Sequence, residues 1–250
     1  MNQDPLCGLI GTSPAIARVR ETIRGLVRPG GKRPNVLLEG EAGTGKSLAA
    51  DLLSHLGRAE APIVAVNCAA MPESLLGALL LGPAPDDTGP PWIKPGLLEL
   101  VGGGTIVLEE VCHLPQAIKA VLPKALDQRT SIISTCNIDM DEALRHGYFG
   151  RALFRRLAAV RIVMPPLRDR GNDVLVLAHW LLARICAQER RPLMTLAPEV
   201  ATRFLHYAWP GNVRELTHML TRAVLLATGS VITVADLDLP PDGPRATTFA

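Results

Sequence analysis

Gly40-Glu41-Ala42-Gly43-Thr44-Gly45-Lys46-Ser47 is the stretch that decides the fold of this chain. It fits the P-loop pattern GxxxxGK[ST] completely: backbone amides wrap phosphates, Lys46 reaches the outer phosphates and the Ser47 hydroxyl can bind magnesium. Residues 35–39 before it read as a buried strand, and residues 47–56 after it as a helix. A structural glycine turn is the alternative, but a chance match between a strand and a helix is disfavoured. The stretch predicts a site for a nucleoside triphosphate and Mg²⁺.

The elements around this loop alternate between strands and helices. Further apolar runs predict strands, at residues 62–67, 105–108, 131–135 and 161–164. Helices are expected at residues 15–27, before the first strand, and at residues 74–81 and 114–126, between later strands. The proline-rich residues 82–95 are expected to form a loop or a poorly ordered insertion. Strands that alternate with helices predict an α/β fold, a parallel sheet sandwiched by helices.

The pattern changes after Pro165-Pro166-Leu167, where strands give way to helices. Helices are expected at residues 173–190, 198–207 and 212–228, followed by a short strand at 231–234. We therefore expect three regions: an α/β nucleotide-binding domain over residues 1–167, a small helical lid over 168–239 and a disordered tail over 240–250.

Composition narrows the class of protein. The 250 residues are 48% hydrophobic and 20% charged, which is typical of a globular chain, and the net charge of +2 is too small to indicate nucleic-acid binding. No signal peptide is expected, because no basic region followed by an apolar one opens the sequence, and no membrane span is expected, because the longest apolar stretch, Val174–Cys186, is short and is interrupted by His179 and Arg184. The five cysteines are scattered without a CxxC pair, so we expect reduced thiols in a cytoplasmic protein, with no zinc site and no disulfide framework.

Carboxylates follow the strand predicted at residues 105–108. In the usual Walker B arrangement the first acid, Glu109, supports Mg²⁺, and the second, Glu110, polarises the attacking water. Two solvated acids at a strand end are the alternative. Asn137 closes the next strand and could orient the same water, although a lone asparagine there is often a turn former.

Two arginine-bearing segments are further candidates. The basic stretch from Gly150 to Arg156 could supply arginine fingers to a neighbouring subunit's nucleotide, or could be a solvated helix face. Asn212 is expected to be the N-cap of a helix whose first turn carries Arg214. Arg214 could point toward the nucleotide, or could be an ordinary surface arginine.

Together these residues resemble the AAA+ domain of bacterial enhancer-binding proteins, the activators of sigma-54 RNA polymerase. The resemblance runs from about Leu9 to Leu239. Besides the P-loop and the paired acids, it rests on these motifs: Leu9-Ile10-Gly11-Thr12-Ser13-Pro14, Asn67-Cys68-Ala69-Ala70, Glu73-Ser74, Gly103-Gly104-Thr105, Pro165-Pro166-Leu167-Arg168-Asp169-Arg170 and Trp209-Pro210-Gly211-Asn212-Val213-Arg214-Glu215-Leu216. The last two are highly specific to the family.

The resemblance implies a ring, most simply a hexamer, with ATP and Mg²⁺ at subunit interfaces. It implies that Asn137 is the sensor I residue, Arg156 an arginine finger and Arg214 the sensor II arginine. It also implies sigma-54 RNA polymerase, or a related activator subunit, as a partner. We expect no direct DNA contact by this chain, because no helix-turn-helix follows residue 239 and no receiver domain precedes Leu9.

The chain departs from the family pattern at the residues that couple hydrolysis to polymerase. The family's remodelling loop, Gly-Ala-Phe-Thr-Gly-Ala, is replaced by Gly82-Pro83-Ala84-Pro85-Asp86-Asp87. Glu109 stands where the family has Asp, and Gly150 stands at the first arginine-finger position, with Arg151 beside it. Three functions stay open: a sigma-54-class ATPase, a regulatory subunit that binds nucleotide but hydrolyses it weakly and acts on a partner or in a mixed ring, and an AAA+ protein with another target.

Overall fold

The computed structural model describes residues 6–26, 33–56, 61–82, 95–127 and 129–239. The chain forms two compact units, and the division does not follow the sequence from end to end. The first unit comprises Met1–Leu6, Glu21–Gly40 and Lys46–Val163, and the second comprises Cys7–Arg20, Glu41–Gly45 and Met164–Ala250. The P-loop thus begins and ends in the first unit, whereas its middle five residues belong to the second.

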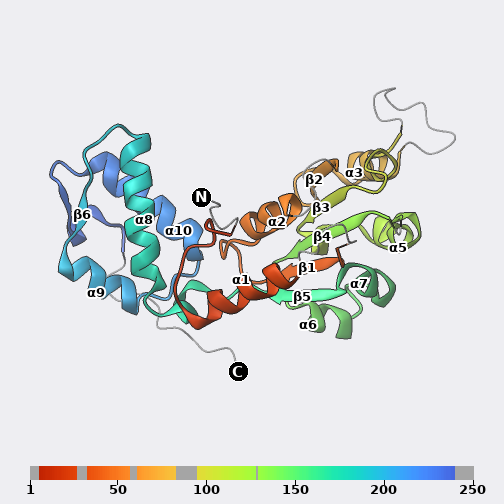
Figure 1. Cartoon of the computed structure of the whole chain (residues 1–250), viewed down its shortest axis with the longest axis horizontal. Coiled ribbons are helices and arrows are strands. Elements are labelled where there is room, and N and C mark those ends of the chain that lie inside the picture. Colours follow the sequence, from red (N-terminus) through yellow and green to blue (C-terminus); the bar gives the residue numbers. More distant parts are fainter. Residues whose placement is uncertain (1–5, 27–32, 57–60, 83–94, 128, 240–250) are drawn as a thin grey trace. The chain divides into compact units, whose positions relative to one another are not determined.

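A five-stranded parallel sheet forms the centre of the first unit (Figure 1). Its strands are β1 (Val36–Glu39), β2 (Ile63–Asn67), β3 (Thr105–Glu109), β4 (Ser131–Cys136) and β5 (Val160–Val163). Their order in the sheet is β2-β3-β4-β1-β5. The predicted parallel sheet is confirmed, and because all strands run the same way, their carboxyl ends meet at one edge.

Helices cover both faces of this sheet. They are α2 (Lys46–His55), α3 (Glu73–Leu81), α4 (Leu97–Leu100), α5 (Gln116–Ala125), α6 (Met140–Arg145), α7 (Arg151–Leu157) and the short 3₁₀ helix η2 (Val111–His113). Leu37 packs in one apolar cluster with residues of α3, α5, α6 and α7. Its neighbours Val36 and Leu38 are equally buried but point to the opposite face, and α2 contacts β1, β3 and β4. The α/β sandwich predicted from the sequence is therefore present.

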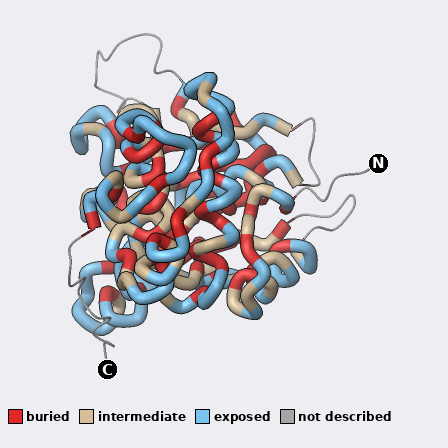
Figure 2. Tube along the Cα trace, turned by 90° about the vertical axis from the view of Figure 1, so that its left-hand side faces the viewer, coloured by how far each residue is buried: buried red, intermediate tan, exposed pale blue. Residues whose placement is uncertain are grey.

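The second unit is mainly helical. It contains α8 (Asp173–Gln188), α9 (Pro198–His206), α10 (Asn212–Leu226), the 3₁₀ helices η3 (Leu167–Arg170) and η4 (Val234–Asp236), and a parallel pair of short strands, β6 (Thr195–Leu196) and β7 (Val231–Ile232). Trp209 lies at its core with 1% of its surface exposed and meets the rings of Phe204 and Tyr207 edge to face. Buried stretches alternate with exposed ones along the chain, as expected for helices that bury one face (Figure 2).

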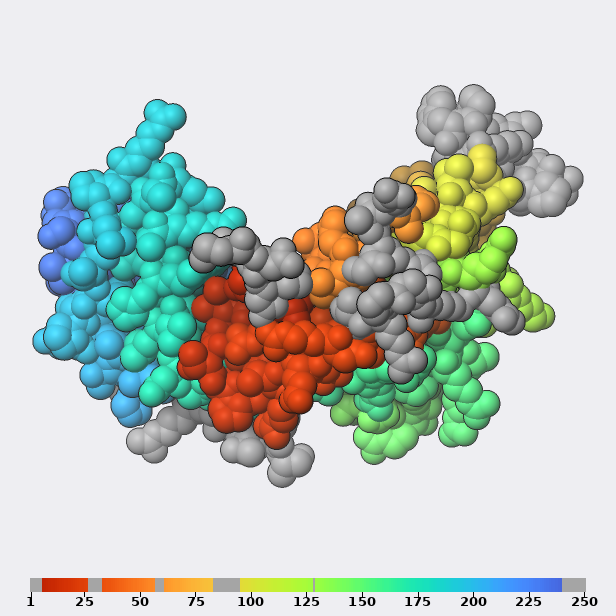
Figure 3. Space-filling view, in the orientation of Figure 1, coloured from red at the N-terminus to blue at the C-terminus, as the bar shows by residue number. Residues whose placement is uncertain are grey.

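The N-terminal segment Cys7–Arg20 belongs to this helical unit, and in the space-filling view its red surface adjoins the teal surface of α8 (Figure 3). Asp173, the first residue of α8, bonds to it. Its carboxylate accepts hydrogen bonds from the backbone N–H groups of Thr12 and Ser13, at 2.6 and 2.9 Å, and from both side-chain hydroxyls. Helix α1 (Pro14–Leu26) starts directly after these residues. Gly11 has a φ of +141°, and a Cβ there would lie 2.5 Å from the Asp173 carboxylate, so only glycine fits.

The structure corrects two expectations. Cys112 and Cys136 form a disulfide, so the expectation that all cysteines are reduced and that no disulfide exists was wrong; a separation of 24 residues gave no sequence signal. Asn212 does not cap α10 through its side chain, which bonds elsewhere, and the N-cap is Gly211.

The strand β6 and helix α6 were not predicted. Most of the expected loop, residues 83–94, and the expected tail, residues 240–250, lie outside the described residues. None of the helices within the described ranges is long and apolar enough to cross a membrane.

Candidate nucleotide site

The candidate site of the first unit lies at the carboxyl edge of the sheet. Gly40, Glu110 and Asn137 directly follow β1, β3 and β4, which are neighbours in the order β3-β4-β1. The backbone N–H of Gly40 donates to the carbonyl of Cys136 at 3.2 Å, which joins the start of the P-loop to the end of β4. The sheet therefore brings together three residues that lie 27 to 97 positions apart in the sequence.

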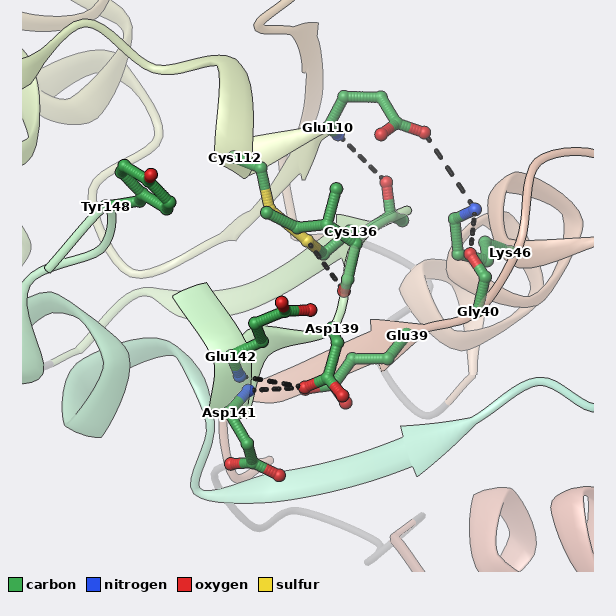
Figure 4. Close-up of a disulfide and its surroundings, with 12 residues drawn as sticks. Glu39, Gly40, Lys46, Glu110, Cys112, Cys136, Asp139, Asp141, Glu142 and Tyr148 are labelled. Carbon is green, nitrogen blue, oxygen red and sulfur yellow. Dashed lines mark hydrogen bonds and ion pairs between the residues drawn. A yellow bond between two sulfur atoms is a disulfide. The ribbon is translucent and has the colours of Figure 1, made fainter. Parts of the chain in front are cut away.

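Lys46 is the charged group at the centre of this edge. It is the first residue of α2 and only 5% exposed. Its Nζ donates to the carbonyl of Gly40 at 2.8 Å and lies 3.9 Å from Oε1 of Glu110 (Figure 4). A buried ammonium at a helix N-terminus is a favourable setting for phosphate, because both the side chain and the helix dipole are positive there.

Glu110 has an unusual backbone conformation. Its φ of 54° and ψ of 50° lie in the left-handed region, which costs a residue with a Cβ about 1–2 kcal/mol. Its N–H donates to the Thr135 hydroxyl at 3.0 Å, and its Oε2 is buried with no hydrogen-bond partner among the described residues. A strained residue with an unsatisfied carboxylate oxygen beside a buried lysine is typical of a functional position.

The residues expected to hold Mg²⁺, Ser47 and Glu109, carry oxygen donors of the kind that this ion takes. Glu109 is the last residue of β3, opposite Asn67 of β2, and Ser47 lies exposed in the first turn of α2. Among the described residues no cluster of three or more acidic, histidine or cysteine side chains could hold a metal ion. Mg²⁺ at nucleotide sites needs no such cluster, because it is held by one or two protein oxygens together with phosphates and water.

Charges of both signs lie along this edge. The pKa of Cys68 is raised to about 12, first by burial of the thiol and then by the charges of Glu109 and Glu110. Glu39, the buried last residue of β1, accepts two hydrogen bonds from Arg161 of β5, at 3.0 and 2.9 Å. Arg161 also donates a hydrogen bond to Asp141.

Residues 41–45 of the P-loop belong to the second unit. Residues of the predicted lid, in the same unit, donate hydrogen bonds to them. Arg168 forms a two-pronged ion pair with Glu41, with one bond at 2.9 Å, and this raises the pKa of the Arg168 guanidinium. Arg170 donates to the carbonyl of Thr44 at 2.6 Å. Asn212 donates to Glu41 and to the carbonyl of Ala42, at 3.1 and 3.0 Å, and the N–H of Val213 donates to the carbonyl of Gly43.

We call these four donors, Arg168, Arg170, Asn212 and Val213, the P-loop clasp. Apart from the Glu41 carboxylate, the clasp occupies backbone carbonyl oxygens and not the amide N–H groups that a P-loop directs at phosphate. The approach is close: a Cβ at Gly43, where φ is +78°, would lie 2.2 Å from the carbonyl of Gly211. Gly43 is therefore required both by its conformation and by its contact with the lid turn.

Asn212 is the buried centre of the clasp. It has no exposed surface, adopts a φ of 51°, and its Oδ1 also accepts the N–H of Leu167 at 2.7 Å. Glu215 steadies the same turn by accepting the N–H of Gly211 and the hydroxyl of Tyr207, both at 2.8 Å. Burial of the Tyr207 ring and this bond raise the pKa of Tyr207 to about 12.

The three candidate arginine positions differ in their surroundings. Arg214 is exposed and lines an open pocket of about 400 Å³ in the second unit, together with Ala42, Gly211, Glu215, His218, Met219, Arg222 and Asp238. Arg156 is half-buried, and its Nη2 donates to the carbonyl of Leu126 at 2.8 Å. Arg151, beside Gly150 at the start of α7, is exposed.

Sequence reasoning missed the clasp and the cysteine pair. Arg168 and Asn212 were quoted as family motifs but were given no role as P-loop ligands. An asparagine directly after a glycine is a weak signal for a left-handed residue whose side chain is free to bond elsewhere. Nothing in the spacing of the cysteines indicated that Cys112 and Cys136 meet.

Comparisons with known proteins agree with this arrangement. The model of the Sigma-54 interaction domain matches residues 9–163, and that of an AAA+ ATPase lid domain matches residues 168–244. The regulatory protein AtoC of Escherichia coli is 34% identical over 223 residues, which cover 83% of this chain and 48% of AtoC. The anaerobic nitric oxide reductase transcription regulator NorR of Salmonella agona is 36% identical over 236 residues, covering 88% of this chain and 46% of NorR.

Solved structures give the same result. NtrX from Brucella abortus in complex with ADP superposes with a TM-score of 0.80 at 25% identity, covering 92% of this chain and 55% of that one. The same protein in complex with ATP gives a TM-score of 0.81 at 24% identity, which bears on the fold alone. The chain spans about half the length of these curated relatives. With a family match over more than half of its residues, the chain belongs to the sigma-54 interaction domain family of AAA+ proteins.

Proposed function

We propose that this chain binds ATP with Mg²⁺ through Gly40–Ser47 and hydrolyses it as a regulator of sigma-54-dependent transcription. The observation that carries the proposal is the meeting of Lys46 and Glu110 at the carboxyl edge of the sheet, 3.9 Å apart, beside a complete P-loop. The family membership and the ADP complex of NtrX, at 25% identity, support the choice of an adenine nucleotide.

Each residue has a defined task in this proposal. Lys46 binds the outer phosphates, and Glu110 accepts a proton from the water that attacks the γ-phosphorus. Asn137 orients that water. Ser47 and Glu109 would hold Mg²⁺, which supplies positive charge to the phosphates. Arg214 is proposed as the sensor II arginine.

We propose further that the chain assembles into a ring, most simply a hexamer, and that an arginine of one subunit reaches the nucleotide of the next. Arg156 is the family's position for this finger. In the structure its guanidinium is bound to Leu126, so Arg156 would have to exchange this bond for a phosphate. Exposed Arg151 needs no such exchange.

The second candidate function is a regulatory subunit that binds nucleotide but hydrolyses it weakly, and that acts on a partner protein or in a mixed ring. The bond from Arg156 to Leu126 favours it, as do Glu109 in place of aspartate and Gly150 at the first finger position. An extra methylene at Glu109 displaces its carboxylate by about 1 Å, enough to disturb a Mg²⁺ shell. Since Gly82–Asp87 lacks the Phe-Thr element, we expect that this chain alone does not activate sigma-54 transcription.

Nucleotide binding and hydrolysis measured side by side, with oligomer mass followed with and without ATP, separate the two functions. The first predicts ATP-dependent assembly and turnover of about 1 s⁻¹ or more, within the ordinary enzyme range. The second predicts binding with turnover far below that rate. Failure to bind ATP would refute both. An open-complex assay in which the chain alone gave ATP-dependent transcription would contradict the expectation drawn from residues 82–87.

A further inference from the structure

A disulfide lies at the edge of the sheet where the candidate catalytic residues meet (Figure 4). Cys112 belongs to η2, two residues after Glu110, and Cys136 ends β4, one residue before Asn137. Their Cα atoms are 6.1 Å apart. The disulfide therefore links the segment after β3 to the end of β4. The carbonyl of Cys136 also accepts the N–H of Gly40, so this link lies where the P-loop begins.

The pair is suited to exchange with a reagent in solution. Cys112 is partly exposed, whereas Cys136 is completely buried, so one thiol can be attacked and the other can resolve the product. The remaining cysteines, Cys7, Cys68 and Cys186, are free thiols.

We propose that Cys112 and Cys136 form a reversible regulatory disulfide, and that the oxidised chain binds ATP but hydrolyses it more slowly than the reduced chain. This inference rests on the proposed function, because it names a control acting on Glu110 and Asn137. The co-reactant is a small disulfide such as oxidised glutathione.

The exchange balances as two ordinary thiol–disulfide steps. The Cys112 thiolate attacks one sulfur of glutathione disulfide, which breaks the S–S bond and releases one glutathione thiolate. The Cys136 thiolate then attacks the Cys112 sulfur, forming the Cys112–Cys136 bond and releasing the second glutathione. The two protons lost by the cysteines are taken up by the two glutathione thiolates, and a dithiol reductant reverses both steps.

The effect on hydrolysis follows from the position of Glu110. In the cross-linked structure its Oε1 lies beside Lys46, and its backbone is held in the left-handed region between β3 and η2. A bound triphosphate brings its outer phosphates to Lys46, so Glu110 must give up this contact and turn toward the water. A covalent bond two residues away opposes that movement. Misplacement of a catalytic group by about 1 Å can lower turnover by about 100-fold.

Binding is expected to respond differently from turnover. The phosphate ligands of the P-loop are backbone amides and Lys46, and the disulfide includes none of them. If the disulfide served only to stabilise the fold, its reduction would lower the free energy of unfolding and would leave ATP turnover unchanged or slower. A regulatory one raises turnover on reduction, with ATP affinity within about 3-fold of the oxidised value.

The test compares the whole chain after treatment with oxidised glutathione and after treatment with dithiothreitol. Peptide mass mapping with thiol alkylation reports whether Cys112–Cys136 has formed. ATP binding, ATP turnover and hydrogen exchange of residues 105–113 and 131–137, with and without a non-hydrolysable ATP analogue, are then measured on both forms. Cys112→Ser removes the pair, and Cys7→Ser is the matched control, because Cys7 is a free, exposed thiol outside the pair.

We expect reduction to raise turnover about 10- to 100-fold in the native chain and in Cys7→Ser, and to have no effect in Cys112→Ser. The analogue should change exchange at both segments only in the reduced form. Equal turnover and equal exchange in the two forms would overturn the inference, as would failure of the pair to form. If neither form hydrolyses ATP, the exchange data alone decide the inference, while the proposed hydrolysis fails separately. If ATP does not bind, the proposed function and this inference both fail.

Discussion

Replacing Asn212 with alanine tests whether the P-loop clasp holds the nucleotide loop. The side chain is fully buried and makes three hydrogen bonds, to the N–H of Leu167, the carboxylate of Glu41 and the carbonyl of Ala42. Alanine removes all three and takes the side-chain partner away from the buried N–H of Leu167 and from the carbonyl of Ala42. It also places a residue that disfavours the left-handed region at a φ of 51°.

The expected loss can be worked from these contacts. A neutral hydrogen bond contributes about 0.5–1.5 kcal/mol and one to a charged group about 1.5–3 kcal/mol. The two neutral bonds and the bond to Glu41 therefore predict that Asn212→Ala lowers the free energy of unfolding of the second unit by about 4 kcal/mol, with backbone strain adding about 1 kcal/mol. Asn212→Gly, which loses the same bonds without the strain, should be about 1 kcal/mol more stable than the alanine variant.

Urea unfolding followed by hydrogen exchange in α10 and η3 measures this loss, and ATP titration measures its consequence. Because residues 41–44 lose part of their support, we expect the ATP dissociation constant to rise by about 10-fold at a temperature where the variant is folded. A loss below about 1 kcal/mol, or no change in ATP affinity, would refute the role given to Asn212. Arg214→Ala, an exposed change in the same helix, should leave the free energy of unfolding within about 0.5 kcal/mol of the native value.

Three further predictions concern the phosphate, the metal and the N-terminal segment. Lys46→Ala should abolish ATP binding, seen by calorimetry, because it removes the buried cation beside Gly40; retained affinity would contradict the assignment. Glu109→Asp should raise turnover several-fold at fixed Mg²⁺ by shortening the carboxylate arm, and a loss of turnover would show that glutamate is the better ligand. Burial alone would raise the pKa of Asp173, but hydrogen bonds from Ser13 and Thr12 outweigh it and hold the pKa below 3.8. The ionised Asp173 carboxylate therefore stabilises the folded chain above pH 3.8, and this stabilisation is lost as the pH falls through the pKa that Asp173 has in the folded chain. Asp173→Asn should lower the free energy of unfolding by about 1–3 kcal/mol near neutral pH and flatten its acid dependence, and an unchanged acid dependence would contradict this.

The sheet and its carboxyl edge could be predicted from the sequence, because the strands are apolar runs and the P-loop requires a strand before it and a helix after it. Val36–Glu39 and Lys46–His55 lie where the motif predicts them. The short β6 was not predictable, since two residues, Thr195 and Leu196, carry no periodicity and gain their strand geometry only by pairing with β7.

The connections between distant residues were beyond sequence reasoning. Asn212 follows a turn and precedes a helix, so local chemistry favoured a cap, but its left-handed backbone turns the side chain toward Glu41 and Leu167. The pairing of Cys112 with Cys136 depends on β3 and β4 being neighbours in the sheet, which follows from strand order and not from spacing. Both are tertiary effects that no local pattern contains.

The rate of ATP hydrolysis by Glu110→Gln, measured under reducing conditions at saturating ATP and Mg²⁺ beside the native chain, tests the central claim most directly. Glutamine keeps the size of the side chain but cannot accept the proton of the attacking water. We predict unchanged ATP affinity and a turnover about 100-fold or more below that of the native chain. Equal turnover in the two proteins would contradict the assignment of Glu110 as the residue that activates water.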